Sequence, residues 1–489
     1  MKLSMGTILA AVLLSSACTQ SPEKKAINAA AAAMGGKERI EAVKTLVIEG
    51  EGPAPNLGQN VTPDGELPVW MVTEFRRSID IPNGRMRTQQ LRTAQFLFAL
   101  ATEQRQNQGL DGDVAYNVNP DGRATRAPDA AAKDRRIEML HHPLTILRAA
   151  LDPATKLSNL HQQVDLDVVG IVTAKGDRFV LTIDRKTHLP LSVSSLSNNE
   201  NLGDVMTETS FSDYRDVSGL KLPFLLTTKI DKYPQFDLHV SKVTVDADAG
   251  DLAAPEEVKN ASPPVAPAVS VTAEPVAKGI WWMAGSGNHR SILFEFDDHL
   301  TLFEVPVSEA RSLAVIARAR SVVPGKPLTQ VIVSHHHFDH SGGLRAAVAE
   351  GLTIITYRDN VEFFKDLVAR KHTIVPDELA KNPRPMNIIP VDDEMTLKDS
   401  SMEVRLYHVL DNPREGTLLF AYVPRDRILV QADLYDSTWT QHPWADNFKW
   451  NLEHRKLVVD KDVPVHGAIQ SYADVLKTIK ATQTAGAGK

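Results

Sequence analysis

Residues 331–343 read VIVSHHHFDHSGG and place four histidines and one aspartate within six consecutive positions, 335 to 340. The short β-branched apolar run ahead of them predicts a buried strand, and the two glycines after them lead into a helix. Neighbouring imidazoles repel one another once protonated, and a packed core has little use for them. A bound cation removes both difficulties, so this stretch predicts a metal site at the carboxyl end of a strand.

The spacing within this stretch separates two sets of ligands. His335 and His337 lie two positions apart on extended backbone, so their side chains can point the same way. Asp339 and His340 follow one turn later and can face a second point nearby. His336 matches neither set, and we expect it to support the loop or to lie at the surface.

Further ligands are expected at the ends of later strands. MEVRLYHVLD presents His408 after an alternating strand, RILVQADLYD presents Asp433 after an apolar one, and DVPVHGAIQ presents His466 before a glycine. His289, in GSGNHRS, is expected only at the rim of the pocket.

With these five ordered elements, residues 271–489 resemble the metallo-β-lactamase fold superfamily. The resemblance implies an α/β domain with four αββα layers. It implies that His335, His337 and His408 hold one metal, that Asp339, His340 and His466 hold a second, and that Asp433 bridges them. Two Zn²⁺ ions suit imidazole and carboxylate ligands, and iron or manganese also fits these ligand types.

Three departures from the usual pattern concern the surroundings of the ligands. The chain has Ala432-Asp433 where many members have Gly-Asp, and Glu304 where many have a structural aspartate. The segment LDNPREG after His408 also differs from the common pattern. Because that segment lies near the substrate side, it leaves the substrate class open more than metal binding.

The ligand set implies a hydrolase. Two cations about 3.5–4 Å apart would hold a bridging water and lower its pKa towards neutrality. Asp339 is the expected catalytic residue, because a free carboxylate oxygen could orient hydroxide or carry its proton. The bridging aspartate resembles glyoxalase II-type thioesterases and lactonases, which implies an ester, lactone, thioester or amide as the small-molecule substrate. The alternatives are a β-lactam-hydrolysing enzyme, a mononuclear iron enzyme resembling persulfide dioxygenases, and a lipid-binding lipoprotein whose metal domain is not catalytic.

The part of the chain before residue 252 has a different pattern. Alternating strands and turns such as DYRDVSGLKLPF predict an antiparallel β-rich (α+β) domain over residues 22–251, which resembles bacterial lipoprotein-carrier sheets. Residues 252–270, rich in Pro and Ala, predict a linker to the catalytic domain of residues 271–489. His141 and His142 are expected on an exposed helix face.

The first twenty residues, MKLSMGTILAAVLLSSACTQ, predict an export signal over residues 1–17. Cys18 is the only cysteine of the 489 residues, so it is either the lipid-bearing residue of a lipoprotein or a free thiol left by cleavage after Ala17. We therefore expect a periplasmic protein or an outer-membrane lipoprotein, attached to the membrane through Cys18. The formal net charge of -7 argues against nucleic acid as a partner. The oligomeric state is left open.

Overall fold

The computed structural model describes residues 20–99, 101–266, 268–285 and 287–486, with side chains of the last helix through Thr482. The predicted signal peptide of residues 1–17 and the predicted lipid site at Cys18 lie outside the described residues. Within those ranges, no helix has both the length and the apolar character that crossing a membrane requires.

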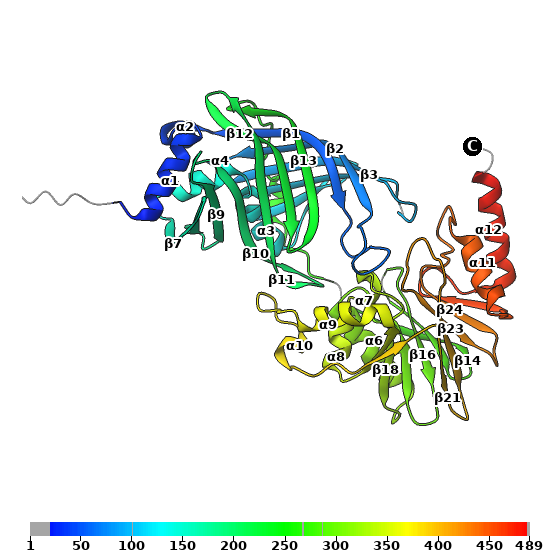
Figure 1. Cartoon of the computed structure of the whole chain (residues 1–489). Helices are drawn as coiled ribbons and strands as arrows, with labels where there is room; N and C mark the ends of the chain where they lie inside the picture. Colours follow the sequence, from blue (N-terminus) through cyan, green and yellow to red (C-terminus); the bar gives the residue numbers. More distant parts are fainter. Residues whose placement is uncertain (1–19, 100, 267, 286, 487–489) are drawn as a thin grey trace, which may run out of the picture.

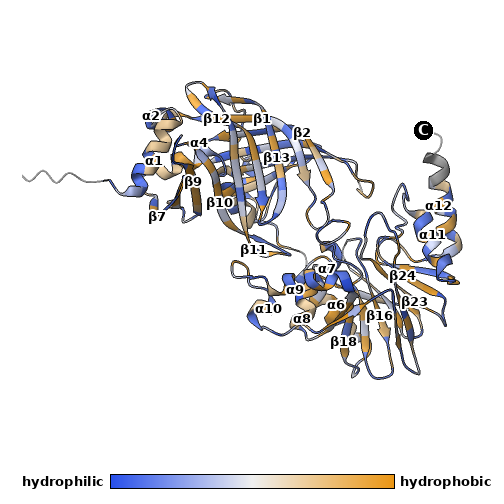
Figure 2. Cartoon of the chain, viewed as in Figure 1, coloured by the Kyte–Doolittle hydropathy of each residue, from blue (hydrophilic) through white to orange (hydrophobic). Residues whose placement is uncertain are grey.

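The N-terminal half is one curved antiparallel sheet of thirteen strands, with helices at one end (Figure 1). Buried and more exposed residues alternate along strands such as β9, so that one face of the strand packs in the core. Hydrophobic and hydrophilic residues are interspersed along the strands of this sheet (Figure 2). The strand order is β6-β5-β4-β3-β2-β1-β13-β12-β11-β10-β9-β8-β7, so the first and last strands are neighbours in the middle of the sheet. The strands are β1 (Thr45–Pro55), β2 (Val69–Asp80), β3 (Arg85–Ala94), β4 (Glu103–Asp111), β5 (Val114–Val118), β6 (Ala124–Arg126), β7 (Lys156–Gln163), β8 (Leu166–Val172), β9 (Arg178–Asp184), β10 (Pro190–Asn199), β11 (Gly203–Val217), β12 (Leu220–Ile230) and β13 (Tyr233–Val245).

Four helices complete this half: α1 (Pro22–Ala33), α2 (Lys37–Ala42), α3 (Asp129–Met139) and α4 (Pro143–Leu151). The apolar face of α1, including Ile27 and Ala30, is buried in the same core as Leu144 and Leu147 of α4. The antiparallel β-rich architecture expected from the sequence is therefore present.

The expectation that His141 and His142 lie on an exposed helix face is wrong. They lie between α3 and α4 and are buried, with 7% and 4% of their surface exposed. His141 contacts the Ser195 hydroxyl at 2.8 Å and the Thr209 hydroxyl at 3.0 Å. His142 accepts a hydrogen bond from the Leu144 amide at the start of α4. His141 can be buried here because neighbouring hydroxyls satisfy both of its ring nitrogens, whereas His142 Nε2 has no hydrogen-bond partner among the described residues.

The segment predicted as a linker is partly attached to the sheet. It contains α5 (Glu256–Asn260), whose buried Val258 packs in one small cluster with Tyr116 of β5. The Tyr116 hydroxyl donates to the Leu252 carbonyl at 3.1 Å.

The C-terminal half contains two facing sheets, each covered by helices on its outer side (Figure 1). The first sheet follows the chain order from β14 to β20 and the second from β21 to β26. Their strands are β14 (Thr272–Ala277), β15 (Ile280–Ala284), β16 (Ser291–Glu295), β17 (Leu300–Phe303), β18 (Leu328–Ile332), β19 (Thr353–Tyr357), β20 (Ile388–Val391), β21 (Glu394–Lys398), β22 (Glu403–His408), β23 (Leu419–Val423), β24 (Ile428–Gln431), β25 (Lys461–Pro464) and β26 (Gln470–Ser471).

Alternation along single strands produces the layers. In β18, Val331 joins the core beneath the helices of the first sheet, whereas Ile332 joins the core between the two sheets. The helices beside the first sheet are α6 (Glu309–Val322), α7 (Phe338–Ser341), α8 (Leu344–Ala349), α9 (Val361–Ala369) and α10 (Glu378–Lys381), and those beside the second are α11 (Ala445–His454) and α12 (Tyr472–Gly486). The predicted αββα fold is confirmed.

Candidate metal centre

Several strands of both C-terminal sheets end at the same edge, and the predicted ligands follow them. The loop after β18 carries His335 and His337, and α7 carries Asp339 and His340. Asp433 and His466 follow β24 and β25, which are parallel neighbours in the second sheet. Asp433 has a φ of 56°, a left-handed backbone conformation that is uncommon outside glycine and recurs at functional sites.

Four imidazoles converge on the two carboxylate oxygens of Asp433. Oδ1 lies 3.0 Å from His466 Nε2 and 3.2 Å from His340 Nε2. Oδ2 lies 3.6 Å from His335 Nε2 and 3.9 Å from His337 Nδ1. All five side chains are buried. The structure therefore brings together two sets of donor atoms, one on each side of a shared carboxylate.

The outward nitrogen of each imidazole faces an oxygen atom. His335 Nδ1 faces the Ser334 hydroxyl at 2.8 Å, and His340 Nδ1 faces Glu304 Oε2 at 3.1 Å. His466 Nδ1 and His337 Nε2 face backbone carbonyls, of Asn288 at 2.6 Å and of Asn60 at 2.7 Å. Because a carbonyl only accepts hydrogen bonds, these last two outward nitrogens carry a proton, and the inward nitrogens are the ones that would offer a lone pair to a metal.

The inward nitrogens are crowded in a way that suits a cation. His335 Nε2 lies 3.0 Å from His337 Nδ1, and His340 Nε2 lies 3.1 Å from His466 Nε2. Without a metal, each pair must share a proton. Burial lowers the pKa of His335 to about 3, whereas the Glu415 and Asp433 carboxylates outweigh the burial of His337 and raise its pKa to about 9. Imidazole nitrogens and carboxylate oxygens are the donors that zinc takes, so the residues present fit a metal.

Asp339 lies at the accessible edge of this cluster. Its Oδ2 is 3.5 Å from His340 Nε2 and 3.3 Å from His289 Nε2, and its Oδ1 accepts a hydrogen bond from Gln59 Nε2 at 2.8 Å. Burial opposes ionisation, but the charge of His340 and the hydrogen bond from His289 hold the pKa of Asp339 well below its usual range. Its side chain is 31% exposed, so the ionised carboxylate can meet a water or a substrate.

His289 was expected only at the pocket rim, but it belongs to the cluster. Its ring nitrogen, a carboxylate oxygen of Asp339 and a ring nitrogen of His466 lie within 4.8 Å of one another. The sequence signal was the cluster of small and polar residues around it, GSGNHRS, in the connection between β15 and β16.

The structure does not bring His408 to this cluster. Its ring stacks on Tyr357, with centroids 3.8 Å apart and planes 7° from parallel, and its Nε2 faces the Gly416 carbonyl at 2.9 Å. As the last residue of β22, His408 has its side chain turned towards β19 of the facing sheet, so the ring lies between the two sheets rather than in the metal site.

Two charged residues of the segment after His408 reach the cluster instead. Arg414 donates from Nε to Asp433 Oδ2 at 2.8 Å, and Glu415 Oε2 lies 2.9 Å from His337 Nε2. Both are buried, and Arg414 Nη1 has no hydrogen-bond partner in the described part of the chain. His336 is also buried and faces Glu415 Oε1 at 3.4 Å, so it supports the loop. The sequence signal was that LDNPREG departs from the common superfamily pattern, but the segment alone did not indicate that Arg414 and Glu415 point inward.

One family model matches part of the C-terminal half. Residues 285–410 match the sequence model of the metallo-beta-lactamase superfamily. Similar solved structures are metallo-beta-lactamases from Pontibacter korlensis (14% identity, covering 44% of this chain and 99% of that one, TM-score 0.34) and from Hirschia baltica (13%, 44% and 98%, 0.34). A metal-soaked flavodiiron core from Synechocystis sp. is also similar (16%, 45% and 61%, 0.34).

Searching the curated proteins gave no match. The solved structures each cover less than half of this chain at low identity, so they say nothing of what it acts on. The family match and the four observed layers concern the same part of the molecule. The C-terminal part of this chain thus has the metallo-β-lactamase fold, and its residues 285–410 match that superfamily.

Proposed function

We propose that this protein is an exported, zinc-dependent hydrolase that cleaves a small carbonyl substrate: an ester, a lactone, a thioester or an amide. One observation carries the proposal: four buried imidazoles, each with an oxygen atom on its outward nitrogen, direct their inward nitrogens at the two oxygens of Asp433. A core without a metal gains nothing from that arrangement, because the inward nitrogens only crowd one another.

Two donor sets would hold two metal ions, and they are unequal. The set on Asp433 Oδ1 comprises His340 and His466, with Asp339 at its edge. The set on Oδ2 comprises His335 and His337 alone, since His408 does not join it. Arg414 already donates to Oδ2, so its positive charge would compete with a cation there. We therefore expect one tightly bound and one weakly bound ion.

A bound zinc supplies Lewis acidity and lowers the pKa of a water it holds towards 7. The protein supplies the proton acceptor. Asp339 is ionised, partly exposed and fixed by hydrogen bonds from Gln59 and His289, so it can orient a water and take its proton. His289 lies beside the same carboxylate oxygen, and it would help Asp339 return the proton to the leaving group.

The proposed substrate class is inferred from the burial of the predicted ligands, and the proposed location from the N-terminal sequence. The ligands are buried except at Asp339 and His289, which favours a small molecule over a polymer. The apolar N-terminus and Cys18 support export to the periplasm and attachment to the outer membrane through a lipid.

Zinc-loaded protein should be screened against lactones, thioesters, β-lactams and phosphodiesters, with elemental analysis of the same sample. We expect hydrolysis of a carbonyl substrate that a chelator abolishes and that zinc restores. His340→Ala should lose both zinc and activity, whereas His454→Ala, at an exposed position of α11, should keep both. One iron per chain without hydrolysis would refute the proposal and favour an oxygen-dependent reaction. Hydrolysis unaffected by the chelator would also refute it.

A further inference from the structure

The loop between β1 and β2, residues 56–68, projects out of the N-terminal sheet towards α7 of the C-terminal half (Figure 1). The amide of Asn56 donates to the Pro68 carbonyl at 2.7 Å and closes the base of the loop. The sheet therefore does not need the residues between them for strand pairing. Asp64 still pairs with Lys232 of the N-terminal half at 3.5 Å, but residues 58 to 61 have contacts in the other half of the molecule.

Four consecutive residues of this loop, 58 to 61, each contact the metal centre or its supporting segment. The Gly58 carbonyl accepts from the Phe338 amide at 3.3 Å, and the Val61 carbonyl accepts from the Gly416 amide at 2.7 Å. Gly58 has a φ of +78°, and a Cβ there would lie 2.2 Å from the Phe338 ring, so only glycine allows this approach. The loop is therefore shaped to fit this surface.

The two residues between these anchors contact two predicted metal ligands directly. The Asn60 carbonyl accepts a hydrogen bond from His337 Nε2 at 2.7 Å, which leaves His337 Nδ1 free to face the cluster. The Gln59 amide donates to Asp339 Oδ1 at 2.8 Å, and its oxygen lies 3.4 Å from Arg414 Nη2. One side chain thus touches both the expected proton acceptor and the buried guanidinium.

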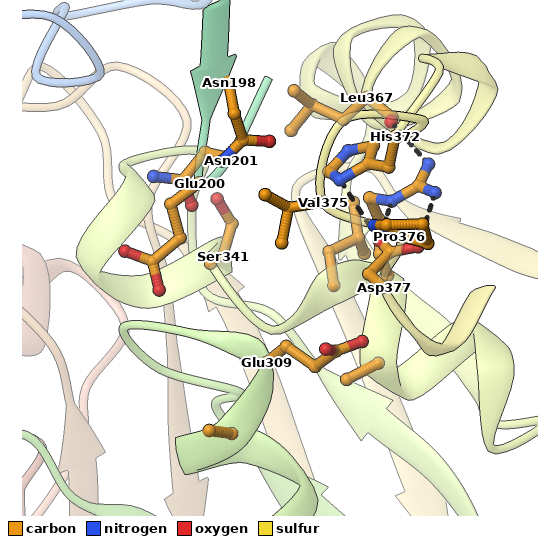
Figure 3. Close-up of a pocket in the computed structure, with 15 residues that line it drawn as sticks. Asn198, Glu200, Asn201, Glu309, Ser341, Leu367, His372, Val375, Pro376 and Asp377 are labelled. Atoms are coloured by element: carbon orange, nitrogen blue, oxygen red, sulfur yellow. Dashed lines mark hydrogen bonds and ion pairs between the residues drawn. The ribbon is translucent and has the colours of Figure 1, made fainter. Parts of the chain in front are cut away.

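A second contact between the two halves holds the sheet in place. Asp204 in β11 accepts hydrogen bonds from the amides of Thr373 and Ile374 at 2.9 and 3.0 Å, and Arg370 pairs with Asp231. Beside it lies a cavity of about 420 Å³, lined by Asn201 from the sheet and by His372 and Asp377 from the C-terminal half (Figure 3). With two separate contacts, the loop cannot pivot freely on the catalytic half.

We propose that the loop of residues 56–68 is a working part of the metal centre, in which Gln59 is a positioning residue for Asp339 and the Asn60 carbonyl fixes the orientation of His337. This inference rests on the proposed function, because it assigns the loop a role towards that metal. The loop also covers the cluster on the side of His337, so a substrate would approach from the side on which Asp339 and His289 are exposed.

The experiment compares zinc affinity, by competition with a chromogenic chelator, in the full-length protein and three variants. Gln59→Leu keeps the size of the side chain and removes its hydrogen bonds. A loop variant replaces residues 57–67 with Asn-Gly, a turn that suits a hairpin between β1 and β2. Gln163→Leu, at the exposed end of β7, is the matched control.

Loss of a hydrogen-bond partner outside the metal ligands weakens metal binding or activity by about 10–100-fold. We expect that range for Gln59→Leu, seen as a weaker zinc affinity and as a fall in kcat larger than the change in KM. We expect at least as large a loss for the loop variant and no change for Gln163→Leu. Far-UV circular dichroism of the loop variant should stay that of the native sheet, which separates a local effect from unfolding.

Unchanged zinc affinity and unchanged kcat in both loop variants would overturn the inference. A failure of the proposed function gives a different result. In that case the unaltered protein itself would bind no zinc, or would bind zinc and hydrolyse no substrate. Zinc affinity alone still tests the inference when no substrate has been found.

Discussion

Replacing Arg414 with methionine is expected to destabilise the metal-free protein far more than the zinc-loaded protein. The guanidinium is buried, donates to Asp433 Oδ2 at 2.8 Å and lies 3.9 Å from the centre of the Phe98 ring. Without a metal, it is a permanent positive charge beside a buried carboxylate. With a metal, the ion takes over that role.

The expected magnitude follows from the burial of the pair. Removing one partner of a buried ion pair costs about 3–5 kcal/mol, because the other charge is left uncompensated. At about 2–4 °C per kcal/mol for a domain of this size, the melting temperature of the metal-free variant should fall by roughly 6–20 °C. The zinc-loaded variant should lose no more than about 1.5 kcal/mol, the usual cost of a volume-conserving change.

The assay is thermal unfolding of the unaltered protein and the variant, each with a chelator and with saturating zinc. Arg427→Met is the control, because Arg427 pairs with Asp460 at 3.5 Å on the surface, where such pairs contribute little. A zinc titration of Arg414→Met should also show tighter binding of the second equivalent. An equal loss of stability with and without zinc would refute the reasoning, since it would mean that no cation replaces the guanidinium at Asp433.

Three further predictions concern groups outside the two ligand sets. His408→Ala should leave the zinc content unchanged in elemental analysis and lower the melting temperature through the lost stacking on Tyr357; a halved zinc content would show that His408 is a ligand after all. Burial raises the pKa of Asp462 to about 8, so the folded protein keeps a proton there that the unfolded chain loses near pH 4. The free energy of unfolding should therefore fall as the pH rises from 4 to 8. In urea unfolding, Asp462→Asn should lack this pH dependence, and an unchanged dependence would contradict the assignment. Burial lowers the pKa of His141 to about 4, so its contribution of roughly 3 kcal/mol to stability is present above pH 6.5 and lost as the pH falls to 4. In urea unfolding, His141→Gln should reduce the pH dependence of the free energy of unfolding over that range. An equally steep loss of stability in acid would show that another group causes it.

Residues on one strand or one short loop were predictable because their geometry is local. The HHHFDH stretch could be placed after β18 from the apolar run before it, and Asp433 and His466 followed from two more strand ends. Strand ends at one edge of a sheet lie close together whatever the details of the loops. The layered fold and most of the cluster therefore depend on patterns that a sequence displays.

His408 shows where this approach stops. Whether the last residue of β22 faces the metal site or the opposite sheet depends on the register of that strand, and a shift of one residue reverses the direction of the side chain. The inward position of Arg414 depends on the path of residues 409–418 before β23, for which the sequence gives no period. The burial of His141 was missed for a related reason, because its partners Ser195 and Thr209 lie far along the chain.

The imidazoles of the candidate metal centre are oriented by hydrogen-bond partners on their outward nitrogens, and these partners come from separate parts of the chain. Glu304 follows β17, Asn288 lies between β15 and β16, Ser334 follows β18, and Asn60 belongs to the other half of the chain. Each partner fixes one imidazole, and a site held to within a fraction of an ångström needs all its ligands fixed together. Three of these partners belong to the C-terminal half itself, whereas His337 takes the Asn60 carbonyl and Asp339 takes Gln59 from the N-terminal half. The thirteen-stranded sheet is therefore not only a neighbour of the C-terminal half, because the hydrogen bonds of the candidate metal centre are completed by a loop that lies more than 270 residues earlier in the sequence.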